Sequence, residues 1–162
     1  MYLQQSDLLW GMDKEFVQKF IGSGMKETHP KGFKLFQEGE PAEFFFIMVK
    51  GSIRISLGEH GRTTYLVNHA GEAFGWSSLV GMKSYTASAQ CLKETTFIRF
   101  TKEFVDEIVE EDPVNGMKFY KRLAGMLGNR LIHSYHLEPA DLSDGLEYSF
   151  GSGKDIESYT TG

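Results

Sequence analysis

Glycine spacing is the feature that most constrains how this chain folds. Between residues 25 and 100, glycines separate short apolar runs that are rich in β-branched and aromatic side chains. Such runs have the length of strands, and glycine is favoured in the tight turns between strands. The segment is therefore predicted to form a small β-unit of the sandwich, jelly-roll or barrel type. The glycines are Gly32, Gly39, Gly51, Gly58, Gly61, Gly71, Gly75 and Gly81.

Six strands are predicted within this segment. They span residues 33–37, 45–50, 52–57, 63–68, 85–91 and 95–100. In residues 52–57, apolar and polar side chains alternate, which predicts a half-buried strand with one face in water. The turns at 49–52 and 58–61 are predicted to close hairpins.

Helices are predicted on both sides of the β-unit. Residues 7–24 and 102–111 carry apolar side chains at spacings of three and four, and Thr101 is the expected N-cap of the second helix. Asp112 and Pro113 are typical of a helix start, so a third helix is predicted over residues 114–135. The folded domain is expected to span residues 7–136, and residues 137–162 to form a disordered acidic tail.

Charge is unevenly distributed along the chain. The whole chain has 17 basic and 22 acidic residues, and residues 137–162 hold six acids against one lysine, which accounts for the entire net charge of −5. A neutral body with an acidic tail is a poor partner for nucleic acid or an anionic membrane. The sequence also has no apolar run of about 20 residues, no secretory signal and no basic recognition helix after residue 135. The expected location is the cytoplasm.

No motif of a catalytic or metal site is present. The five histidines do not form a metal-binding pair, and no Gly-x-Ser-x-Gly segment occurs. The single cysteine, Cys91, lies in an apolar strand pattern and is predicted to be a core residue, so a disulfide within the chain is excluded. We expect a protein that is not an enzyme and that holds no metal and no cofactor.

Three segments carry a resemblance to a known family. In order, they are Gly-Phe-Lys-Leu-Phe-Gln-Glu-Gly-Glu at 32–40, Phe-Phe-Ile-Met-Val-Lys-Gly-Ser-Ile at 45–53, and Gly-Glu-Ala-Phe-Gly at 71–75. The chain resembles the cyclic nucleotide-binding domain over residues 16–135. The resemblance implies a mainly β fold, an eight-stranded jelly-roll-like β-roll with one helix before it and two after it. It also implies that the last helix, with Tyr120, Leu123, Leu127 and Leu131, covers the pocket as a lid or pairs two subunits.

The resemblance also locates a ligand pocket, with two departures. Where the family has a Glu for the ribose hydroxyl, this chain has Trp76. Where the family has an Arg for the cyclic phosphate, it has Tyr85, or Thr86 if the loop is one residue longer. None of these side chains carries the charge of the residue it replaces, so cAMP and cGMP are expected to bind about two to four orders of magnitude more weakly. The expected pocket residues are Phe74, Gly75, Trp76, Ser77, Ser78, Leu79, Tyr85, Thr86, Ala87 and Ser88.

Three functions are compatible with this sequence. The first is a regulatory sensor whose more aromatic pocket binds another small molecule. The second is a protein-interaction module whose pocket is filled by Trp76 and Tyr85. The third is cyclic nucleotide binding in an altered pose, through the amides of residues 77–80 and Thr86.

A homodimer through the last helix is also predicted. The residues predicted to contact the second chain, which we call the seam, recur at steps of three and four, as in a two-helix contact. The seam consists of Tyr120, Leu123, Leu127, Arg130 and Ser134. Small residues on the same helix, Gly116, Ala124, Gly125 and Gly128, indicate close approach of another element.

Overall fold

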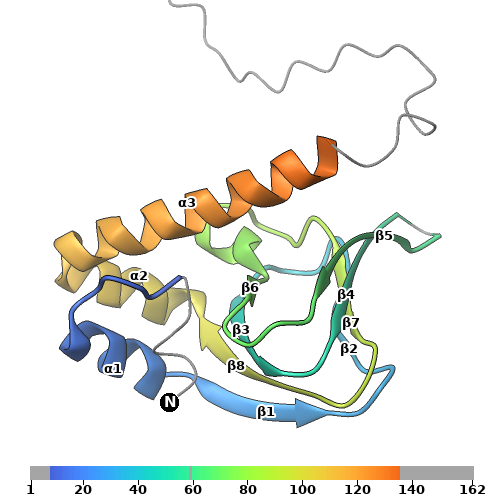
Figure 1. Cartoon of the computed structure of the whole chain (residues 1–162), viewed down its shortest axis with the longest axis horizontal. Helices are drawn as coiled ribbons and strands as arrows, with labels where there is room; N and C mark the ends of the chain where they lie inside the picture. Colours follow the sequence, from blue (N-terminus) through green and yellow to red (C-terminus); the bar gives the residue numbers. More distant parts are fainter. Residues whose placement is uncertain (1–7, 59, 136–162) are drawn as a thin grey trace, which may run out of the picture.

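The structure is a computed structural model that describes residues 8–58 and 60–135 (Figure 1). The predicted acidic tail, residues 137–162, lies outside the described residues. The elements in chain order are α1 (Lys14–Gly22), β1 (Met25–His29), β2 (Lys34–Phe36), β3 (Phe44–Lys50), β4 (Ile53–Leu57), β5 (Arg62–Val67), β6 (Ala73–Phe74), the 3₁₀ helix η2 (Trp76–Leu79), β7 (Ser88–Cys91), β8 (Thr95–Thr101), α2 (Lys102–Glu111) and α3 (Pro113–Tyr135).

The strands form two antiparallel sheets of four strands each. One has the order β1-β8-β3-β6 and the other the order β2-β7-β4-β5. The helices α1 and α2 pack at one end of the roll, and α3 runs from them along the molecule past β6 and η2 (Figure 1). The expected eight-stranded β-roll with flanking helices is therefore confirmed.

Strand β3 is buried on both faces and divides the core into two clusters. Phe45 and Ile47 face the helices, where they pack with Phe20 and Phe119. On the opposite face of β3, Phe46 and Met48 lie in the cluster between the two sheets. A strand that is covered on both sides needs apolar residues at successive positions, which explains the unbroken apolar run in this segment.

The predicted hairpin at residues 49–52 is wrong. Strands β3 and β4 do not pair, since they belong to different sheets, and the chain crosses between the sheets at Gly51. Gly51 has a φ of 128°, and a Cβ there would lie 2.4 Å from the Thr95 hydroxyl oxygen, so only glycine fits this crossing. The turn at 58–61, in contrast, joins the paired strands β4 and β5 as predicted.

Sequence periodicity missed two strands and misjudged two others. Strand β1 lies at an edge of its sheet with mostly exposed polar side chains, so it has no apolar run, and β6 has only two residues. In β4 the predicted alternation breaks at a bulge between Ile55 and Ser56, so that Ser56 is buried and Leu57 is exposed. The predicted strand at 85–91 begins only at Ser88.

The helix starts after β8 agree with the sequence. The Thr101 hydroxyl accepts from the Phe104 amide, and the Asp112 carboxylate accepts from the Asn115 amide at 3.1 Å. The first helix is shorter than predicted, because Gly11 has a φ of 82° and Asp13 is extended, and α1 begins at Lys14. Of the described helices, none is long and apolar enough to cross a membrane.

Candidate functional site

A cavity of about 610 Å³ lies between the second sheet, the η2 segment and α3; we call it the roll pocket. Its lining is dominated by apolar and aromatic side chains. The residues are Phe36, Ile55, Leu57, Thr64, Tyr65, Phe74, Gly75, Trp76, Ser77, Tyr85, Thr86, Ala87, Leu127, Arg130 and Leu131. Concave, largely apolar sites with a few polar groups are typical of small-molecule binding.

Seven of the ten predicted pocket residues line this cavity. They are Phe74, Gly75, Trp76, Ser77, Tyr85, Thr86 and Ala87. The other three lie elsewhere: Ser78 is fully buried, Leu79 belongs to the core beneath the helices, and Ser88 lines a different depression on the outer side of its sheet. These three residues are therefore not part of the lining of the roll pocket.

Tyr85 forms one wall of the pocket, and its hydroxyl is already hydrogen-bonded within the protein. Its ring stacks on Phe36 with 3.8 Å between centroids, and its hydroxyl donates to the Phe44 carbonyl at 2.8 Å. Burial raises the pKa of the Tyr85 phenol above its ordinary value, so it stays neutral. Tyr85 thus offers a ligand an aromatic face and no charge.

The η2 turn holds Trp76 at the pocket. Gly75 precedes it with a φ of 73°, and a Cβ on Gly75 would lie 2.7 Å from a ring carbon of Phe46. The Ser78 hydroxyl donates to the Gly75 carbonyl at 3.1 Å, and this local hydrogen bond stabilises the turn. Trp76 is half-buried and packs on the core beneath the helices while it lines the cavity.

Helix α3 covers the pocket with its second half. Leu127 and Leu131 line the cavity, as the lid prediction requires. Leu123 is buried in the core, and the Tyr120 hydroxyl donates to the Leu79 carbonyl at 3.4 Å. These two residues therefore anchor α3 and do not contact the cavity. Four members of the predicted dimer seam, Tyr120, Leu123, Leu127 and Arg130, contact the protein's own roll, and pairing of two chains through α3 stays a prediction.

Arg130 is the pocket residue whose role the sequence did not predict. Its guanidinium donates from Nη2 to the Ala73 carbonyl, and its central carbon lies 4.3 Å from the centre of the Tyr65 ring. Tyr65 in turn donates to Glu72 at 2.9 Å. Burial, helped by this hydrogen bond, raises the pKa of Tyr65. A single arginine within a segment of apolar and small residues was the signal, but the sequence does not say what it contacts.

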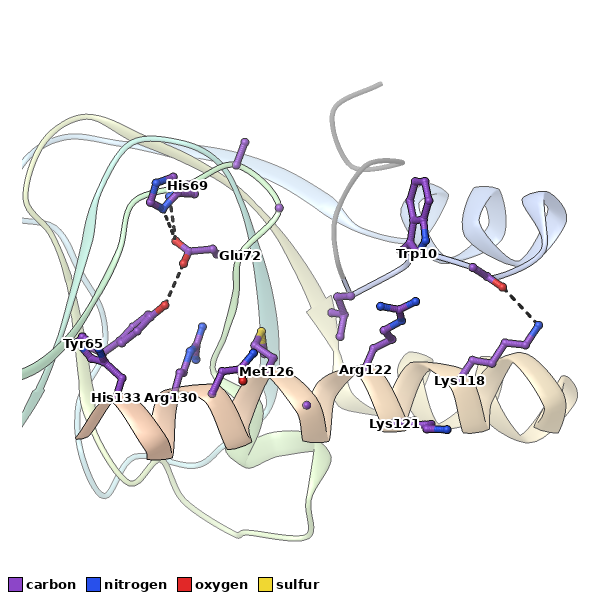
Figure 2. A pocket seen from close by; sticks show the side chains of 16 residues that line it. Trp10, Tyr65, His69, Glu72, Lys118, Lys121, Arg122, Met126, Arg130 and His133 are labelled. Atoms are coloured by element: carbon purple, nitrogen blue, oxygen red, sulfur yellow. Dashed lines mark hydrogen bonds and ion pairs between the residues drawn. The ribbon is translucent and has the colours of Figure 1, made fainter. Parts of the chain in front are cut away.

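A second depression of about 1120 Å³ runs along the other side of Arg130 (Figure 2); we call it the α3 groove. Met126, Arg130 and His133 of α3 lie on the side of the loop that carries His69 and Glu72. At the other end of the groove, Arg122 and Lys118 lie beside Trp10, and Lys118 donates to the Gly11 carbonyl at 3.3 Å. His69 Nδ1 lies 3.6 Å from a Glu72 oxygen. Among the described residues, no three His, Cys, Asp or Glu side chains converge in a way that would hold a metal ion.

Comparison with known proteins identifies the family. The family model described as "Cyclic nucleotide-binding domain" matches residues 26–112. This chain belongs to the cyclic nucleotide-binding domain family. The fold of such a domain supports a regulatory, ligand-binding role.

Solved structures of cyclic nucleotide-binding domains and sensor domains have the same fold. A cyclic nucleotide-binding domain from Methylobacillus flagellatus KT is 21% identical, with a TM-score of 0.74 over 83% of this chain and 79% of that one. The sensor domain of the transcriptional regulator DNR from Pseudomonas aeruginosa is 20% identical, with a TM-score of 0.65 over 85% of this chain and 93% of that one. At these identities the likeness shows the fold alone.

A curated protein also contains a similar segment. Glutaminase 1 of Bradyrhizobium diazoefficiens is 25% identical over 130 residues, which are 80% of this chain. This chain spans only 21% of the length of that glutaminase.

Proposed function

We propose that this domain is a regulatory module whose roll pocket binds a small aromatic ligand, and that it binds cAMP and cGMP weakly. The observation that carries the proposal is the open cavity of about 610 Å³ that Trp76 and Tyr85 border without filling. We propose a binding role and no enzymatic role for the chain.

The polar groups of the pocket support this choice of ligand. A cyclic nucleotide presents ribose hydroxyls and a phosphate, which need an acceptor and a cation respectively. The described lining of the cavity contains no carboxylate, and its one cation is Arg130, whose Nη2 already donates to the Ala73 carbonyl. Its hydroxyls are those of Thr64, Tyr65, Ser77, Tyr85 and Thr86. Tyr65 and Tyr85 already donate to protein acceptors. Aromatic walls with few unused polar groups favour a flat, largely apolar molecule.

The volume of the cavity favours a ligand-binding function over a pure protein-interaction module. A pocket filled by Trp76 and Tyr85 would leave no space for a ligand of drug-like size, whereas cavities of about 300–1,000 Å³ hold such ligands. Tyr85 stacks on Phe36 and Trp76 packs toward the core, so both rings lie at the edge of the space.

Calorimetry and thermal unfolding of the full chain test the proposal. We expect the neutral aromatic amide 2-naphthamide to bind and raise the melting temperature, and cAMP and cGMP to bind with dissociation constants well above the micromolar range. Ala87→Phe should block the pocket and abolish naphthamide binding. Ala70→Phe introduces the same ring at an exposed position outside the pocket and should have no effect. A low-micromolar dissociation constant for either cyclic nucleotide would contradict the proposal.

We also propose a homodimer through the outer face of α3. The stripe consists of Met117, Lys121, Ala124 and Gly128, at steps of four, three and four residues. Met117 is 66% exposed, and a Cβ on Gly128 would meet no atom within 4 Å. This spacing is that of a two-helix seam, and the small residues allow the helix axes to approach. Gly116, by contrast, serves an internal contact, since a Cβ there would lie 2.6 Å from Val109.

A further inference from the structure

Arg130 brings one positive charge to an otherwise uncharged pocket. It is the only charged residue among the described residues that line the roll pocket. It comes from α3, and its side chain reaches toward Tyr65 on the opposite wall (Figure 2). The charge therefore lies between the helix and the sheet, where a ligand in the pocket would meet it.

The guanidinium of Arg130 is only partly satisfied. Its Nη2 donates to the Ala73 carbonyl, but its Nε–H is buried and has no hydrogen-bond partner. A buried donor without a partner is unfavourable, and charged donors gain most from an anionic acceptor.

The Glu72 carboxylate, which Tyr65 contacts on the same wall, is already occupied by other donors. One Glu72 oxygen accepts from the Tyr65 hydroxyl at 2.9 Å. The other accepts from the backbone amides of Asn68 and His69, each at 2.9 Å. The Arg130 guanidinium also lies over the face of the Tyr65 ring. The ring attracts the cation but accepts no conventional hydrogen bond. The pocket thus supplies aromatic surface to Arg130 and no anion.

We propose that the ligand of the roll pocket is an aromatic carboxylate and that Arg130 is the receptor of its carboxylate group. This inference rests on the proposed function, since it specifies the ligand of the same pocket. The planar guanidinium presents parallel N–H donors that match the two oxygens of a carboxylate. Trp76, Tyr85 and Phe36 supply the flat walls that an aromatic ring requires.

The position of Arg130 also couples the ligand to α3. The same guanidinium holds α3 against β6 through the Ala73 carbonyl. A carboxylate that binds this group competes with the carbonyl for its donors, so ligand binding changes the contact between α3 and the roll. The helix that carries the proposed dimer stripe is therefore the element that responds to the ligand.

A matched pair of probes tests the inference in the full chain. The probes are 2-naphthoate and 2-naphthamide, which share the ring system and differ in charge, measured by calorimetry at neutral pH. We expect naphthoate to bind about 10- to 100-fold more tightly, because hydrogen bonds to charged groups are stronger than neutral ones. Arg130→Gln should remove this preference, so that the ratio of the two dissociation constants falls to about one. Arg122→Gln removes an exposed arginine of the same helix that lies outside the roll pocket, and it should keep the preference.

Nuclear magnetic resonance of the wild-type protein gives an answer that does not depend on how the variant folds. In protein labelled with ¹⁵N arginine, naphthoate should shift one Nε–H signal strongly, and naphthamide should not. Equal affinity of the two probes, with no such shift, overturns this inference and leaves the proposed function standing. If neither probe binds up to its solubility limit, this inference and the proposed function are both overturned.

Discussion

The Tyr85 hydroxyl is hydrogen-bonded to both backbone polar groups of Phe44. It donates to the Phe44 carbonyl at 2.8 Å and accepts from the Phe44 amide at 3.0 Å. The first residue of β3 is thereby joined to the segment that follows η2, 41 positions away in sequence. Tyr85, which the sequence places where the family is expected to have its phosphate-binding arginine, thus ties a pocket wall to the sheet.

Replacing Tyr85 with Phe should destabilise the domain. Both Phe44 groups would lose a partner in a partly buried place, at a cost of about 1–3 kcal/mol in unfolding free energy. Urea unfolding monitored by circular dichroism measures this cost. Tyr120→Phe is the control, because its hydroxyl makes one long contact of 3.4 Å to the Leu79 carbonyl. An equal loss in the two variants would contradict the special role of Tyr85.

Replacing Gly75 with Ala should destabilise the domain more than replacing Gly81. Both glycines have positive φ, 73° and 78°, so each substitution carries a backbone cost of about 1–2 kcal/mol. At Gly75 the added Cβ would also lie 2.7 Å from a Phe46 ring carbon and 3.2 Å from the Phe44 carbonyl oxygen, whereas at Gly81 no atom lies within 4 Å. We expect a difference of about 1–3 kcal/mol between the variants in denaturant unfolding, from overpacking alone. Equal stabilities would show that Phe46 moves aside without cost.

Asp112 should make stability depend on acid pH. Hydrogen bonds from the Asn115 side chain and backbone hold the pKa of Asp112 below its ordinary value of 3.8. Because the folded-state pKa is the lower one, the stabilisation is complete above the ordinary value and disappears as the pH falls through the folded-state pKa. Unfolding free energies measured from about pH 6 to pH 2 should therefore fall less steeply in Asp112→Asn than in the wild type.

Asn115→Ala provides a check on this explanation. It removes the amide that donates to Asp112 Oδ2 at 2.7 Å and to Asp13 Oδ2 at 2.9 Å. The pKa of Asp112 should then move back toward its ordinary value, and the acid dependence should shrink. If the acid dependence of the unfolding free energy is the same in Asp112→Asn, Asn115→Ala and the wild type, it arises from other carboxylates.

The proposed dimer predicts a different response on each face of α3. Ala124→Glu places a charge in the outer stripe and should convert a dimer to a monomer in light scattering at tens of micromolar. Asn129→Glu places the same charge on the α3 groove, also at an exposed position, and should leave the mass unchanged. A wild-type mass of one chain would reject the stripe as an interface. The side chain of Ser134, which the predicted seam included, lies outside the described residues.

Features set by neighbouring residues were predictable from the sequence. The caps at Thr101 and Asp112 each join groups three residues apart, so their sequence signals held in the fold. The turn at 58–61 is local in the same way, since Gly61 donates to the Gly58 carbonyl. Seven of the ten expected pocket residues line the cavity because they occupy one short segment around η2 and a second just before β7.

Features that depend on distant contacts were decided by the tertiary structure. Apolar spacing located β3 and β4 but did not show that they belong to different sheets, because pairing is set by partners far away in sequence. Likewise, the sheet residues that complete the roll pocket, Ile55 and Tyr65 among them, had no local signal.

The orientation of α3 is the clearest case. Its sequence carries apolar residues on two faces, with Leu123 and Leu127 on one and Met117 and Ile132 on the other. Periodicity predicts that such a helix packs, but two apolar faces leave its rotation open. Contacts with the roll selected the face of Leu123, and the same rotation brought Arg130 onto Ala73 and Tyr65. The helix and its residues were thus determined by the sequence alone, whereas the shape of the surface beneath it decided which side chains enter the pocket.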